Sequence, residues 1–257
     1  SDVALSIDAG SNNFTLNGTK TIGNSNSIGD LTISAGDLII GGAVDVGAND
    51  ISITEASGDG IGLGTALSGT AMDVTDAELG FLTGANLTLA TAGNITVNAV
   101  TAGGTDTISG TTLLSATGSG NVSFSTGDSK FTNALVVQGT AINLDRSVTT
   151  VGSDLTFKDA LNVDGSVTVD SGNGGAAATA GNVTFEGIVS ANDGTGDALT
   201  VTANGSTTDG DVDFQADVDG TQDLDGLTIS AANQVDLQNV VLDAGNLSVT
   251  GTNIDLN

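Results

Sequence analysis

The chain has 257 residues with 31 acidic side chains, only four basic ones, and a net charge of −27. Nucleic acids and anionic membranes attract clustered Lys and Arg, so this charge balance argues against both as partners. The absence of Cys excludes disulfide bonds and thiolate metal sites, and no apolar run reaches the roughly 18 residues that insertion in a membrane requires.

Apolar residues spaced two positions apart recur from the start of the chain. Four pairs follow one another at steps of six or seven residues: Leu31/Ile33, Leu38/Ile40, Val44/Val46 and Ile51/Ile53. This period is typical of short strands that bury one face. Three such strands, joined by corners rich in Gly, Asn and Asp, would close a coil of about 20 residues.

Three segments interrupt this cadence and are expected to be loop insertions, near 55–82, 100–120 and 170–181. The first contains the one stretch with helical periodicity, at residues 75–82, which predicts a single helical turn. Loops inserted into a stacked-repeat protein commonly form its binding surface.

A longer motif repeats in the second half of the chain. GNVSF begins at Gly120, SDLTF at Ser153, GNVTF at Gly181, GDVDF at Gly210 and NQVDL at Asn233, so the steps are 33, 28, 29 and 23 residues. A second apolar pair follows in each interval: Ile142/Leu144, Val167/Val169, Leu199/Val201, Leu227/Ile229 and Ile254/Leu256. Self-similarity of this kind predicts an all-β fold, a parallel β-helix (β-solenoid) of about 10–12 coils that is one continuous unit over residues 1–257.

The aromatic residues of these repeats fall at matching positions. Phe124, Phe157, Phe185 and Phe214 each close the strand motif, so we expect them to form a stack inside the coil. Replacing Phe185 with Asp should therefore bury an unpaired charge and unfold the chain.

The densest run of acidic residues lies in the segment 209–225. Ca²⁺ prefers several oxygen ligands, so a weak calcium site is one interpretation; in the other, these side chains face water, as expected for Asp211 and Asp213 on either side of Val212. The spacing matches neither the helix–loop–helix calcium loop nor the nonapeptide calcium roll. The seven residues are Asp209, Asp211, Asp213, Asp217, Asp219, Asp223 and Asp225. No other cofactor is expected.

Catalysis is hard to assemble from these residue types. The usual nucleophile–base pairs need His or Cys, and a glycosidase-like pair of carboxylates normally works beside Trp or Tyr, none of which is present. The single outward Thr of each strand is ordinary sheet surface rather than the paired Thr rows of an ice-binding face. We therefore expect no enzyme.

Two segments resemble a known family. The GNVTF…LTV cadence, and GDGIGLG at 58–64 followed by DAELGFLTGANLTLATAGNITV at 76–97, are similar to repeats of filamentous-haemagglutinin-like large bacterial adhesins. The resemblance implies a right-handed β-helix in an exported bacterial protein, located outside the cell or on its surface.

Both ends of the chain read as strands, from Val3 to Ile7 and from Asn253 to Asn257, without an evident cap. Open coil ends need a partner, which we expect to be flanking coils of a longer chain or another copy in an end-to-end homopolymer. The expected function is the structural rod of an exported surface fibre, extracellular filament or adhesin stalk. The alternative is an adhesin module that recognises a cell-surface glycan or host surface through the insertions at 55–82 or 100–120.

Overall fold

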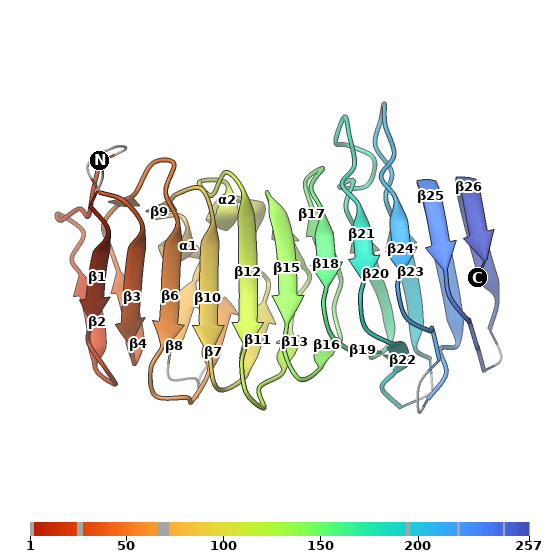
Figure 1. Ribbon diagram of the computed structural model, residues 1–257, viewed down its shortest axis with the longest axis horizontal. Helices are drawn as coiled ribbons and strands as arrows, with labels where there is room; N and C mark the ends of the chain where they lie inside the picture. Colours follow the sequence, from red (N-terminus) through yellow and green to blue (C-terminus); the bar gives the residue numbers. More distant parts are fainter. Residues whose placement is uncertain are drawn as a thin grey trace.

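The computed structural model describes residues 3–24, 28–65, 72–193, 196–219, 222–243 and 245–256. Its short strands wind into one long coil with three faces, and strands of successive coils pair in parallel. The parallel β-helix predicted from the repeats is therefore confirmed (Figure 1).

The first face holds eleven strands within these ranges, in agreement with the expected number of coils. In order along the rod they are β1 (Leu5–Asp8), β3 (Leu31–Ala35), β6 (Ile51–Glu55), β10 (Leu87–Thr91), β12 (Thr111–Ala116), β15 (Ala134–Gln138), β18 (Leu155–Phe157), β21 (Val183–Phe185), β24 (Val212–Phe214), and the C-terminal parts of β25 (Gly226–Leu237) and β26 (Leu247–Leu256).

The other two faces are assembled in the same way. The second face comprises β2 (Asn13–Leu16), β4 (Asp37–Ile40), β8 (Met72–Thr75), β7 (Ile61–Gly64), β11 (Ile95–Asn98), β13 (Val122–Phe124), β16 (Ile142–Leu144), β19 (Leu161–Val163) and β22 (Val189–Ala191). The third comprises β5 (Val44–Asp45), β9 (Leu82–Thr83), β14 (Ser129–Phe131), β17 (Val148–Thr150), β20 (Ser166–Asp170), β23 (Ala198–Thr202) and the N-terminal parts of β25 and β26.

The winding is right-handed, as the family resemblance implies. In Figure 1 the first-face strands run downwards in front, the chain returns behind them, and the coil advances from the N-terminal to the C-terminal end. Strand β25 turns the corner from the third face to the first without a break, with a register shift between Ile229 and Ala232.

The register confirms coils of about 20 residues where the corners are short. Leu31 pairs with Ile51, and Leu135 pairs with Leu155, each 20 positions later. Other coils are longer: Leu155 pairs with Val183, 28 positions later, because the loop between β20 and β21 lies within that coil. The added residues leave the strand stack intact.

Alternation along each strand directs one row of side chains inwards, where successive coils cover one another. Leu31, Ile33, Ile51 and Ile53 are almost wholly buried, and the same pattern continues along the rod to Val235 and Leu237. Burial of each such side chain is worth about 1.5–3 kcal/mol. One coil alone cannot exclude water from both sides of its inward row, so the coils stabilise one another.

The predicted aromatic stack forms with three members. The rings of Phe157 and Phe185 lie 5.4 Å apart and those of Phe185 and Phe214 lie 4.4 Å apart, both pairs nearly parallel. Including Phe124 was wrong: it is buried in β13 on the second face, in register with Val97 and Leu144. The 33-residue step from GNVSF to SDLTF is therefore not one coil.

The second apolar pairs divide in a similar way. Val167/Val169, Leu199/Val201 and Leu227/Ile229 align in register on the third face. Ile142/Leu144 instead lies on the second face, and Ile254/Leu256 lies on the first. An apolar–polar–apolar motif defines a strand but not which face of the coil it occupies.

Two short helices contact each other at the edge of the coil, one beside strands β7 and β8 of the second face and the other beside β14 of the third. The helical turn predicted at 75–82 is confirmed as α1 (Asp76–Leu79), which begins with a capping box between Thr75 and Glu78. The second helix, α2 (Ala102–Thr105), was not predicted, because its sequence AGGT lacks an apolar period and its N-cap side chain makes no capping bond.

Candidate functional site

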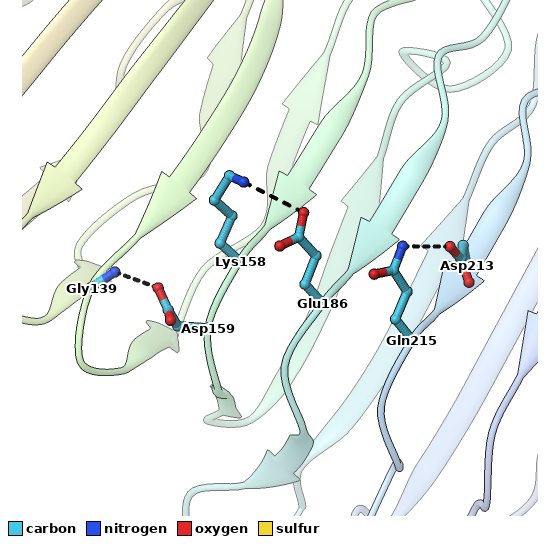
Figure 2. A network of polar contacts seen from close by, with 6 residues as sticks. All are labelled: Gly139, Lys158, Asp159, Glu186, Asp213 and Gln215. Atoms are coloured by element: carbon cyan, nitrogen blue, oxygen red, sulfur yellow. Dashed lines mark hydrogen bonds and ion pairs between the residues drawn. The ribbon is translucent and has the colours of Figure 1, made fainter.

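The seven aspartates of the acidic run are not brought together. Asp211 accepts hydrogen bonds from the side-chain amide of Asn233 at 2.8 Å and the backbone of Gln234 at 3.1 Å, whereas Asp209 accepts from the backbone of Gly205 at 3.0 Å. Asp213 accepts from Gln215 (Figure 2), and Asp225 accepts from the backbone of Gly196.

The remaining members lie in the connection from β24 to β25, and Asp217 meets β22 through its backbone carbonyl. Within the described residues, which include all seven, no group of three or more acidic side chains is placed to hold a metal ion. Strand alternation and separate corners distribute these carboxylates over different partners. The arrangement favours the interpretation in which they face water and cap corners over the interpretation as a calcium site.

A hollow lies along the corner between the first and second faces. Five residues, 117–121, join β12 to β13, whereas three residues each join β15 to β16 (139–141) and β18 to β19 (158–160). The longer corner is tied to the next one by Thr140, whose hydroxyl donates to the carbonyl of Gly118 at 3.3 Å. The result is a groove of about 420 Å³.

The groove contains both hydrogen-bond donors and acceptors, from several coils. Gln138, Lys158 and Glu186 each follow an inward residue of the first face, namely Val137, Phe157 and Phe185, which are in register. The three polar side chains therefore stand in one row outside the aromatic stack. The full lining is Ala116, Thr117, Gly118, Gln138, Gly139, Thr140, Lys158, Asp159 and Glu186.

The charged groups of the groove make two polar contacts across neighbouring coils (Figure 2). The ammonium group of Lys158 lies 3.6 Å from a carboxylate oxygen of Glu186, and these side chains are 41% and 37% exposed. A carboxylate oxygen of Asp159 accepts from the backbone of Gly139 at 2.9 Å. An ion pair this exposed contributes little to stability, so its members can exchange partners at small cost.

A second, smaller hollow of about 250 Å³ lies over the outer side of the second face. Its base is a ladder in which Asn143 donates to Ser123, Asn162 donates to Asn143, and Ser190 donates to Asn162, all at 3.1 Å. Each of these hydrogen bonds spans one coil spacing, so the ladder joins four coils.

Two carboxylates border this ladder. Desolvation raises the pKa of Asp145, the negative charge of Asp164 raises it further, and the guanidinium of Arg146 opposes the shift. Asn192 donates to Asp164 at 3.3 Å. The hollow offers oxygen-rich surface without a basic side chain among its lining residues.

Three further carboxylates are buried and accept hydrogen bonds from backbone amides at the corners of the coil. Glu55, on β6, accepts from Thr91 at 2.8 Å and from the backbone of Gly58 at 2.9 Å, and Asp170 accepts from the backbones of Gly172 and Gly174. Burial raises the pKa of Glu55, but the hydrogen bonds from Ser57, Thr91 and Gly60 outweigh it, so the net shift is downwards. Asp197, also buried, accepts a hydrogen bond from the backbone N–H of Gly165 at 2.6 Å. These carboxylates satisfy corner amides and are not open to a ligand.

The C-terminal coil presents apolar side chains to solvent. Leu247, Ile254 and Leu256 continue the inward rows of Leu227, Val235 and Leu237, which are fully buried. The three terminal side chains are 42%, 47% and 66% exposed. At the other end, β1 pairs along one edge with β3, and Val3 is 75% exposed.

Sequence reasoning missed the groove residues. The available signal was the polar residue directly after the last inward residue of a first-face strand: Gln138, Lys158, Glu186 and Gln215. It became readable only once the strands were assigned to faces and the corner lengths were known.

Comparisons with protein-family models, curated proteins and solved structures produced no match. In the part of the chain that the structure describes, no helix is long and apolar enough to cross a membrane.

Proposed function

We propose that this chain is the structural rod of an exported bacterial surface fibre, extracellular filament or adhesin stalk, and that rods join end to end. One observation carries the proposal: the strands stack in parallel into one continuous rod with buried inward rows. Leu247, Ile254 and Leu256 on β26 continue those rows, so this edge can pair with a further coil, either of another copy or of the same longer chain. Eleven first-face strands at a spacing of about 4.8 Å extend roughly 50 Å along the axis, a shape suited to a spacer. The resemblance to filamentous-haemagglutinin-like repeats supports the same role.

End-to-end joining would extend the existing parallel ladder. The first-face part of β26, with Ile254 and Leu256, would pair with β1 of the next copy, whose Leu5 and Ile7 are inward residues in register with Leu31 and Ile33. Such a contact joins two different surfaces, so it propagates instead of closing. Flanking coils of a longer chain would cover the same surface by the same pairing.

Sedimentation velocity and negative-stain microscopy of the purified chain test the joining. We expect species that lengthen with protein concentration and with added salt, because salt screens repulsion between rods of charge −27. Ile254→Asp should abolish lengthening. Ile188→Asp is the matched control, since Ile188 is similarly exposed at 46% but lies on the flank between β21 and β22. Monomers at every concentration and salt level would contradict end-to-end joining.

A second function, recognition of a glycan or host surface by an inserted segment, is favoured by the groove. Thr117 and Gly118 line it; they lie in the corner after β12, at the end of the expected 100–120 segment, of which residues 111–116 form a first-face strand and are not an insertion. Adhesion of the chain to glycan-coated surfaces, compared with a variant in which residues 117–121 are shortened to three, tests this role. We expect adhesion to fall while the melting temperature stays close to that of the parent.

A further inference from the structure

We infer that the groove around Lys158 binds an uncharged, hydroxyl-rich ligand, namely a short neutral oligosaccharide. This inference rests on the recognition role proposed above and specifies its site and ligand class. It begins from the shape: the five-residue corner 117–121 and the two three-residue corners that follow it border a hollow of about 420 Å³. Ligand pockets commonly measure about 300–1,000 Å³, so the groove can hold one to a few sugar units.

The arrangement of polar groups matches sugar hydroxyls, which both donate and accept hydrogen bonds. Lys158 supplies donors, and the carboxylates of Asp159 and Glu186 and the amide carbonyl of Gln138 supply acceptors. Hydrogen bonds that involve a charged group are the stronger ones. A vicinal diol could therefore replace the exposed Lys158–Glu186 contact with two charge-assisted bonds.

Charge decides between the classes of ligand. An anionic polymer would be repelled by a chain of net charge −27, since only four of its residues are basic and one of them stands in this groove. A metal cation would meet the ammonium of Lys158 between the carboxylates. A neutral ligand avoids both penalties.

The groove is built on a rigid support. Phe157 and Phe185, whose rings stack at 5.4 Å, directly precede Lys158 and Glu186 in the chain, so the spacing of the two charged residues follows that of the stacked coils. Gln138 is held by its amide, which donates to Ser115 at 2.7 Å and leaves the amide carbonyl as an acceptor. Asp159 is held by the backbone of Gly139. Polar groups held in one row can bind a ligand with little additional loss of conformational entropy.

The test is a titration of ¹⁵N-labelled chain carrying Ile254→Asp, which keeps it monomeric, followed by amide chemical shifts. The probes are maltotriose, cellotriose and chitotriose, with trigalacturonate and CaCl₂ alone as the charged alternatives. We expect at least one neutral trisaccharide to shift the amides of residues 117–118, 138–140 and 158–159 with millimolar affinity. Lys158→Met and Glu186→Gln should each weaken that binding about tenfold or more.

Asp213→Asn is the control, because Asp213 lies on the same face but contacts Gln215 outside the groove (Figure 2). It should leave the affinity unchanged, and all variants should melt close to the parent. Tighter binding of trigalacturonate, or the same shifts with CaCl₂ alone, would overturn the neutral ligand. If neutral sugars shifted only amides outside the groove, the groove would not be the binding site, although the proposed recognition role would stand. No response to any of the trisaccharides would overturn both.

Discussion

Thr112 places a hydroxyl group in the aliphatic interior of the first face. Its neighbours in register are Leu87 and Leu135, and the side chain is 1% exposed. Across the described residues its Oγ1 has no hydrogen-bond partner. In the unfolded chain water satisfies this hydroxyl, so folding pays the full desolvation cost, which is about 1–3 kcal/mol for a buried group without a partner.

Thr112→Val replaces the hydroxyl with a methyl group of nearly the same shape. We expect a gain of about 1–3 kcal/mol in the free energy of unfolding. In a chain of this size each kcal/mol raises the melting temperature by about 2–4 °C. Urea unfolding followed by circular dichroism should show a higher midpoint with an unchanged slope.

Thr88→Val is the matched control, since Thr88 lies on the neighbouring strand β10 with its side chain outward and half-buried. Its effect should stay within about 0.5 kcal/mol. If Thr112→Val destabilised the chain, or matched the control, the hydroxyl would have to be satisfied in the folded state and the reasoning would fail.

Three further substitutions test the core and the carboxylates. Phe185→Ala, in the middle of the aromatic stack, should cost about 3–5 kcal/mol in urea unfolding, whereas Phe81→Ala, at a site already 37% exposed, should cost far less. Because the pKa of Glu55 lies below its ordinary value of 4.5, its ionised form stabilises the fold above that pH, and the contribution is lost as pH falls through the lowered pKa. Glu55→Gln should therefore cost about 2 kcal/mol at neutral pH and flatten the acid side of the stability profile, and the same change at exposed Glu186 should do neither. For Asp145 the sign reverses: burial and then Asp164 raise its pKa, so stability falls as pH rises through that pKa, and Asp164→Asn should lower the pKa of Asp145 in a carboxyl ¹³C titration.

The strands were predictable because period-two alternation is a local property. Leu31/Ile33 and Ile51/Ile53 reveal both the inward face and the length of a coil, and the later repeats place Phe157, Phe185 and Phe214 in register. Phe124 was misplaced because the same alternation occurs on all three faces, and nothing local distinguishes a first-face strand from a second-face one.

The groove and the interior polar groups depend on information that no single repeat contains. The groove arises from the difference between a five-residue and a three-residue corner, which becomes visible only when neighbouring coils are aligned. Thr112 sits inward because TTLL aligns Leu114, not Leu113, with Leu89. The same limitation applied to the acidic run: composition suggested calcium, but the partners of Asp211 come from the next coil.

The central claim is that successive coils stack in parallel along one axis, and distances between spin labels measure this most directly. The chain has no Cys, so pairs of labels can be introduced at chosen sites. Thr32, Thr156 and Asp213 lie in one outward row of the first face, with Thr156 five coils and Asp213 seven coils beyond Thr32. At about 4.8 Å per coil, the Thr32–Asp213 distance should exceed the Thr32–Thr156 distance by roughly 10 Å, around means near 34 and 24 Å. Equal distances, or a shorter one for the pair farther apart in the sequence, would contradict the stacked coil.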